Sequence, residues 1–196
     1  MNIDVRYALS VFALVSSITP GPNNLMLLAS GANFGIVRTL PHMLGVAIGF
    51  TVMVFLVGVG LMGVFDVIPY SYEALKILST IYLCWLAWKI ANAAAPTDQA
   101  ESGSPFTFIQ AALFQWVNPK AWSMALTAIA LYAPDRSMTA VIGVTLVFGF
   151  VNLPSITVWV LLGQKMRDVL SNRTRLKAFN TAMALALIAT LYPVLF

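Results

Sequence analysis

Hydrophobic residues follow one another along this chain in long blocks that polar stretches separate. A helix that spans a bilayer needs about 20 mostly apolar residues, and these blocks have about that length. Helices are the expected form, because an open strand edge in lipid would leave backbone groups unpaired. The alternating pattern of a membrane barrel is absent. The pattern predicts six transmembrane helices, in the ranges Tyr7–Ser30, Pro41–Phe65, Ile68–Ala91, Phe106–Tyr132, Met138–Gly163 and Ala178–Phe196.

The composition indicates the same class of protein. Of 196 residues, 60% are hydrophobic and 9% are charged, whereas ordinary soluble domains carry roughly 25% charged residues. So few charges cannot cover a soluble particle, which excludes a soluble enzyme and a disordered protein. The net charge of +4 comes from residues between the blocks rather than from one patch, so we expect no nucleic-acid partner. The single cysteine, Cys84, excludes a disulfide framework and a thiolate metal cluster. We predict an all-α integral membrane protein in contact with the lipid bilayer.

Basic residues predict the orientation of this protein. The polar stretch Gln164–Lys177 carries five of them, and Arg38 and Lys89 fall on the same side of the predicted helices. Because basic loops mark the cytoplasmic side, both termini are expected to be periplasmic. Trp85 and Trp88 beside Lys89 fit an interfacial belt on that side. At the cytoplasmic start of the second block, His42 is expected to be solvated.

The two halves of the chain resemble each other. When residue 1 is placed against residue 98, blocks one, two and three align with blocks four, five and six. We therefore divide one membrane domain into a first repeat (about 5–91), a linker (92–105) and a second repeat (106–196). Three is an odd number of helices, so the two repeats must have opposite orientations. Inverted repeats of this kind are typical of secondary transporters.

Proline and asparagine interrupt blocks one and four at equivalent positions. A proline lacks the backbone donor and clashes with the preceding turn, so both helices are predicted to be broken. Backbone groups that a break leaves free can bind a solute near the middle of the membrane. A lone proline more often makes only a kink, but two matching elements favour a site. The candidate substrate-binding residues at the two breaks are Thr19, Pro20, Gly21, Pro22, Asn23, Asn24, Gln115, Asn118, Pro119 and Lys120.

Lys120 is the most informative of these candidates. A lysine in the middle of a membrane helix costs about 2.5–3.5 kcal/mol, and such residues usually face a cavity or a partner. Snorkelling to the interface is the alternative, if block four begins later than its hydrophobicity indicates. The acidic residues nearest to the blocks, Asp66 and Glu73, lie close to an interface. A substrate carboxylate would therefore serve as counter-ion of Lys120, while a substrate ammonium would meet carbonyls freed by Pro20, Pro22 and Pro119.

Further small and polar residues have more ordinary explanations. Gly45 and Gly49 provide the small-residue spacing of close helix packing. Asn152 either lines a cavity or makes a hydrogen bond between helices. Intramembrane His, Asp and Cys are nearly missing, so neither a metal site nor a cofactor is expected. The nucleophile–base pair or paired carboxylates of a membrane enzyme are absent as well.

The order of these motifs resembles the LysE/RhtB family of amino-acid exporters over essentially the whole chain. The resemblance is carried by the stretch from Thr19 to Asn24, Gly35, Gly45 with Gly49, Leu75-Lys76, Tyr82-Leu83, Trp85-Leu86 and Asn118-Pro119-Lys120-Ala121. It implies a bacterial inner-membrane exporter of amino acids or their derivatives that is driven by an ion gradient. The pattern is most similar to the branch that exports cysteine and O-acetylserine, or homoserine and threonine.

The chain departs from that family at a few positions, and other functions stay open. Ala111 and Gln115 stand where family members often have glycine and asparagine, which affects the size of the substrate. The leading prediction is a secondary exporter of small amino acids, by proton-coupled antiport, with a homodimer as a possible assembly. The alternative is a passive channel or an exporter of another small solute.

Overall fold

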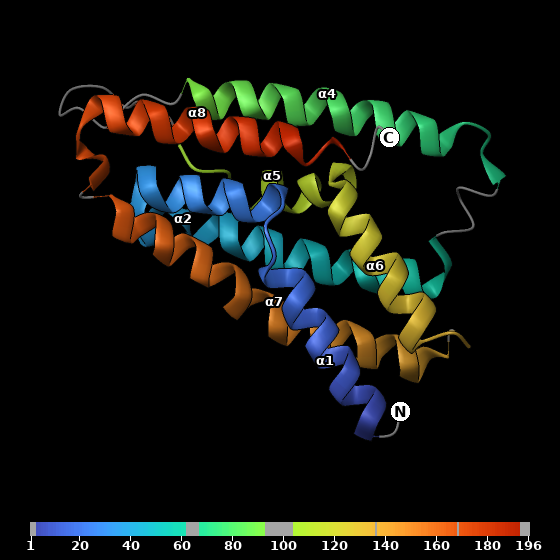
Figure 1. Ribbon diagram of the computed structural model, residues 1–196. Helices are drawn as coiled ribbons and strands as arrows, with labels where there is room; N and C mark the ends of the chain where they lie inside the picture. The colour runs from blue at the N-terminus through green and yellow to red at the C-terminus, as the bar shows by residue number, and fades with distance from the viewer. Residues whose placement is uncertain (1–2, 62–66, 93–103, 136, 168, 193–196) are drawn as a thin grey trace.

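The computed structural model describes residues 3–61, 67–92, 104–135, 137–167 and 169–192, and these ranges contain helices and no strand. The predicted linker and the last residues of the second and sixth blocks fall largely outside the described residues. Figure 1 shows an elongated bundle whose chain ends lie toward the same end. Its elements are α1 (Ile3–Ile18), α2 (Pro22–Leu56), the π-helical turn η1 (Val57–Leu61), α4 (Ser71–Ala91), α5 (Phe108–Phe114), the 3-10 turn η2 (Gln115–Val117), α6 (Pro119–Tyr132), α7 (Met138–Met166), the 3-10 turn η3 (Val169–Ser171) and α8 (Arg173–Ala189).

Helix α2 reverses its direction at one glycine. Gly35 has a φ of 75° and a ψ of 171°, a conformation that glycine adopts without the steric cost of a side chain. The reversal places Ser30 beside Thr39, and their hydroxyls lie 2.9 Å apart. The predicted loop between Ser30 and Pro41 is therefore wrong, because helix continues on both sides of a single-residue turn. Figure 1 shows the two arms of α2 running back along each other.

Within the described ranges, three stretches of helix are long and apolar enough to cross a membrane. They are Pro22–Gly60, which includes the reversal at Gly35, Glu73–Ala91 and Met138–Met166. The remaining apolar helices are shorter, and two of the predicted spans are divided by breaks. The all-helical class with apolar helices is thus confirmed, and the arrangement of six spans in two inverted repeats stays a prediction.

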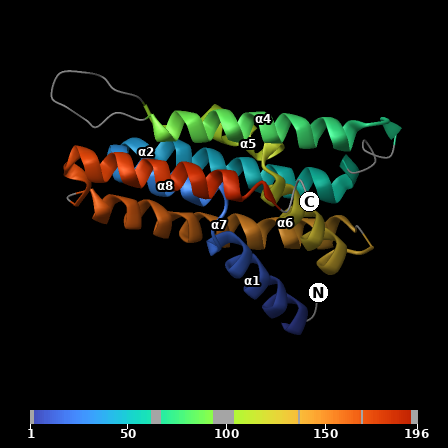
Figure 2. The same cartoon turned by 45° about the horizontal axis from the view of Figure 1, so that its top comes forward.

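The helices pack in pairs that bring the two halves of the chain together. Helix α2 lies along α7, and α4 lies beside α8; Figures 1 and 2 show the α4–α8 pair together along one side of the bundle. Helix α1 packs on α7, and α5 packs on α2. Each contact joins a helix of the first half to one of the second, so the fold depends on pairing between the halves.

The outer surface of the bundle is apolar. Phe150 is 77% exposed and Leu185 is 65% exposed, and many other large hydrophobic side chains are exposed as well. Trp85 and Trp88 are exposed beside Lys89, and Trp85 also lies against the Lys89 ammonium. Their place in an interfacial belt stays a prediction. Such a surface suits lipid rather than water.

Glycines allow the closest helix contacts. A methyl group at Gly163 of α7 would overlap the Leu28 carbonyl oxygen of α2, and one at Gly49 would lie 2.6 Å from the Ala112 Cα atom of α5. The packing role expected for Gly49 agrees with this geometry. Small residues thus bring the backbones of the two halves together.

We expect Gly163→Ala to destabilise the protein by about 1–3 kcal/mol, the usual cost of overpacking, because its backbone neighbour cannot rotate away. Gly149→Ala on the same helix is the control, since its nearest neighbours are Thr51 side-chain atoms at 3.5 Å. Thermal unfolding in detergent measures both. Equal stability of the two variants would contradict this account of the α2–α7 contact.

Candidate functional site

The first break lies between α1 and α2. Helix α1 ends at Ile18 and α2 begins with Pro22 as its first helical residue, the position where proline's missing donor and fixed φ cost least. Thr19, Pro20 and Gly21 connect them. The predicted break in block one is therefore present.

The second break lies between η2 and α6. Asn118 leaves the helical conformation with φ −93° and ψ 107°, and its side-chain oxygen accepts a hydrogen bond from the Lys120 backbone N–H at 3.1 Å. Pro119 is the first residue of α6, as Pro22 is of α2. At both breaks a non-helical residue is thus followed by a proline, and this proline is the first residue of the next helix.

The break leaves carbonyl groups at the end of α1 that the helix itself does not satisfy. Trp159 Nε1 donates to the Ile18 carbonyl oxygen at 3.0 Å. Asn24 Nδ2 donates to the carbonyl oxygens of Ser17 at 2.8 Å and of Thr19 at 2.7 Å. Side chains of α2 and α7 therefore replace the missing helical partners, as backbone groups in an apolar bundle require.

Lys120 reaches from the second break to the first. Its Nζ atom donates to the Thr19 carbonyl oxygen at 2.7 Å, to Thr19 Oγ1 at 2.9 Å and to the Pro20 carbonyl oxygen at 3.2 Å. Gly21 makes room for it, because a methyl group there would lie 2.5 Å from Lys120 Cδ. In this conformation two of the carbonyl oxygens at the first break, those of Thr19 and Pro20, are bonded to a lysine of the protein rather than to a substrate ammonium.

An amide pair forms a second bridge between the two breaks. Asn23 Nδ2 donates to Gln115 Oε1 at 2.8 Å, and Gln115 Nε2 donates back to Asn23 Oδ1 at 3.1 Å. Gln115 is fully buried and also bonds the Ala111 carbonyl oxygen at 2.9 Å. Two of the predicted site residues thus satisfy each other across the interface of the halves.

A small space lies between the two breaks. Its volume is about 20 Å³, which fits about one water molecule. The buried Ser17 hydroxyl faces this space and has no hydrogen-bond partner among the described residues. The residues around the space are Ser16, Ser17, Gly21, Asn23, Asn24, Phe50, Asn118, Lys120, Ala121, Met124, Asn152 and Ile156. An amino acid needs more room, so the two breaks are closed against each other here.

The structure gathers most of the predicted candidates at this point. Five of them line the small space, while Thr19 and Pro20 bond Lys120, and Gln115 bonds Asn23. Pro22 and Pro119 start helices and do not line it. Sequence reasoning missed Ser16, Ser17 and the apolar side chains; the two serines directly before the first break were the available signal.

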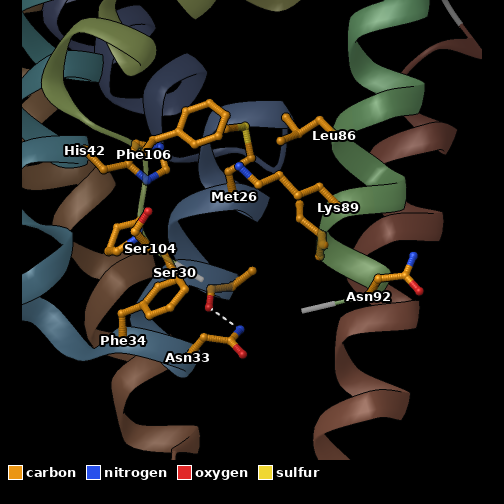
Figure 3. A pocket seen from close by; sticks show the side chains of 13 residues that line it. Met26, Ser30, Asn33, Phe34, His42, Leu86, Lys89, Asn92, Ser104 and Phe106 are labelled. Atoms are coloured by element: carbon orange, nitrogen blue, oxygen red, sulfur yellow. Dashed lines mark hydrogen bonds between the residues drawn. The ribbon is translucent and has the colours of Figure 1, made fainter. Parts of the chain in front are cut away.

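A larger cavity lies apart from the breaks, between α2, α4 and the segment before α5. It has a volume of about 340 Å³ (Figure 3), and its polar lining includes Ser30, Asn33, His42 and Lys89. The expectation of a solvated His42 is wrong, because the side chain is only 2% exposed and neither ring nitrogen has a hydrogen-bond partner among the described residues. The turn at Gly35 folds His42 back into the bundle, which a hydrophobicity pattern does not reveal.

Comparison with known proteins identifies the family. The chain matches the LysE type translocator family over residues 14–191. It belongs to that family. Among its relatives are cysteine/O-acetylserine efflux proteins of Escherichia coli (strain K12) and Shigella sonnei (strain Ss046), each 26% identical over 181 residues and matched over 90% of both chains. No solved structure matches.

Membership of the LysE family agrees with the apolar surface and the helical fold. The family and these relatives are transport proteins and not enzymes. Together with the apolar helices, the family makes this chain a multi-pass inner-membrane transport protein. Its two breaks and its larger cavity are therefore features of a transport protein.

We expect Asn24→Ala to lower the free energy of unfolding by about 1–3 kcal/mol, because the buried Ser17 carbonyl loses its side-chain donor. Ser10→Ala removes only an exposed hydroxyl that bonds within α1 and serves as the control. Thermal unfolding in detergent compares them. If the two variants lose equally little stability, Asn24 does not hold the end of α1.

Proposed function

We propose that this LysE-family protein exports small amino acids or their derivatives across the bacterial inner membrane by proton-coupled antiport. The family and the efflux proteins that match nearly the whole chain support an amino-acid cargo. The substrate, the coupling ion and a homodimer are parts of the proposal that rest on the sequence pattern.

The arrangement we propose is a pair of inverted three-helix repeats. The packing supports it, since α1 packs on α7 of the second half while α5 packs on α2 of the first. These two contacts are equivalent if a two-fold axis exchanges the halves. Pro22 and Pro119 also match when residue 1 is set against residue 98.

The contact of the Lys120 ammonium with Thr19 and Pro20 carries the proposal for the site. A zwitterion offers the groups that could replace this contact. Its ammonium takes the place of Nζ on the carbonyl oxygens, and its carboxylate pairs with the released lysine. The proposed polar wall consists of Thr19, Pro20, Gly21, Pro22, Asn23, Asn24, Gln115, Asn118, Pro119 and Lys120.

A carrier is favoured over a passive channel by the space between the breaks. A volume of about 20 Å³ leaves no continuous path for an amino acid in this conformation. Cargo must then pass through a change between conformations, as alternating access requires. An exporter of another small solute would use the same movement, so the cargo has to be identified by transport.

Transport into inverted membrane vesicles tests the proposal. We expect uptake of O-acetyl-L-serine, within a panel of amino acids, to saturate and to depend on an imposed pH gradient. Uptake that rises linearly with concentration and ignores the gradient would contradict a proton-coupled carrier and favour a channel.

In the same assay, we expect Lys120→Met to insert normally and to lose export. The variant lacks the ammonium that, in this proposal, leaves the carbonyl oxygens and pairs with the carboxylate of the cargo. Lys165→Met, an exposed lysine near the end of α7, is the control and should transport normally. Export by Lys120→Met at the parental rate would leave Lys120 as a snorkelling residue and remove it from the site.

The orientation follows from the basic loop. We expect residues 164–177 to be cytoplasmic and both termini to be periplasmic. Reporter proteins fused after Phe196 measure this. A reporter that is active only in the cytoplasm would reverse the proposed orientation.

A further inference from the structure

The larger cavity has the size and composition of a ligand site. Its volume of about 340 Å³ falls in the range of small-molecule pockets. Most of its lining is apolar, including Met26, Phe34, Leu86 and Phe106, with a small number of polar groups among them. A mostly apolar wall with few fixed polar groups selects a small ligand that has a polar and an apolar part.

Three polar atoms of this lining are buried and have no hydrogen-bond partner in the part of the chain that the structure describes. They are both ring nitrogens of His42 and the side-chain oxygen of Asn33, which is 5% exposed. The Asn33 amide nitrogen, in contrast, donates to Ala29 and Asn180 oxygens at 2.7 and 3.2 Å. Buried polar atoms are normally hydrogen-bonded, so unpaired ones on side chains that line a cavity offer hydrogen bonds to a ligand that reaches them. Asn33 offers an acceptor, and His42 offers at least one donor.

A positive charge lies at the His42 end of the cavity. The Lys89 ammonium is 5.6 Å from the centre of the Phe106 ring, and the His42 ring is 5.3 Å from the same centre. Figure 3 shows Lys89 extending from α4 toward this ring, with Asn33 away from it. Among the described residues, Lys89 has ring contacts and no carboxylate partner. The cavity therefore has donors and charge at one end and an acceptor oxygen toward the other.

One face of α2 links this cavity to the broken helices. Asn23 bonds Gln115 at the breaks, and Met26 and Ser30 follow it at intervals of three and four residues. Asn33 continues the series, and residues at this spacing share a face of a helix. The cavity also lies at the basic end of the bundle, where Arg167 approaches Gly35. That end is cytoplasmic in the proposed orientation, the side from which an exporter collects cargo.

We propose that this cavity is a second binding site, which holds a zwitterionic amino acid with a short, uncharged side chain before it reaches the breaks. Its carboxylate lies beside Lys89 and His42, its ammonium donates to the Asn33 side-chain oxygen, and its side chain contacts Met26 and Leu86. The assignment of an amino acid rests on the proposed function, whereas the unpaired groups and the charge come from the cavity alone.

His42 provides a direct signal for the test, because it is the single histidine of the chain. Protein purified in detergent with isotope-labelled histidine gives one imidazole in the NMR spectrum. We expect O-acetyl-L-serine to shift its nitrogen resonances in a saturable manner. Lys89→Met, at an exposed position, should raise the Kd about tenfold or more, as loss of a charged hydrogen bond predicts.

Two comparisons make the test specific. Lys165→Met removes a lysine outside the cavity lining and should leave the Kd unchanged. The methyl ester of O-acetyl-L-serine lacks the carboxylate charge. It should bind the parental protein as weakly as the amino acid binds the Lys89→Met variant. Its own Kd should be the same for the parental protein and for Lys89→Met. No shift at saturating amino acid, or an equal Kd in Lys89→Met, would overturn the site.

Failure of this inference is distinguishable from failure of the proposed function. The NMR titration needs no ion gradient and no transport. If uptake is saturable and depends on the gradient but the His42 nitrogen resonances do not shift, the second site alone is overturned. We also expect Lys120→Met, which loses export, to keep the His42 shift and its Kd, since Lys120 does not line this cavity. Loss of the shift in that variant would overturn the separation of the two sites.

Discussion

The structure depends on how the backbone carbonyls at the broken end of α1 are satisfied. In an apolar bundle such groups have no water to bond, and an unpaired one costs several kcal/mol. Asn24, Lys120 and Trp159 provide the donors, from α2, α6 and α7. The break is therefore stable only when the two halves of the chain are packed together, and local chemistry at one proline motif fixes the contact between these halves.

The same contacts explain why the centre of the bundle is closed. Lys120 and the Asn23–Gln115 amide pair hold the two breaks against each other, and only about 20 Å³ remains between them. A zwitterion carries the same kinds of groups as these bridges. Within the proposed function, cargo competes with these internal contacts. Binding of the cargo therefore separates the two breaks and opens the space between them.

The small space at the breaks and the larger cavity differ in how their polar groups are paired. Around the breaks, amides and the lysine are paired within the protein, whereas His42 and the Asn33 oxygen at the larger cavity have no partner among the described residues. Gly35 connects the two regions structurally, because its turn folds the second arm of α2 back along the first. Within the two proposals, cargo enters at the larger cavity and then passes along α2 to the breaks.

The sequence by itself determined the class of the protein, the breaks and the family motifs. Apolar blocks and few charges require lipid, and the matching proline–asparagine elements at Pro22 and Pro119 favour breaks there, whereas Pro41 and Pro154 lie inside helices. Only the tertiary structure decided which partner each freed group bonds. Lys120 meets Thr19 across 101 residues, and His42 is buried because one glycine turns the chain. Such long-range pairings depend on the packing of α2 against α7 and α5, which a pattern of hydrophobic positions does not encode.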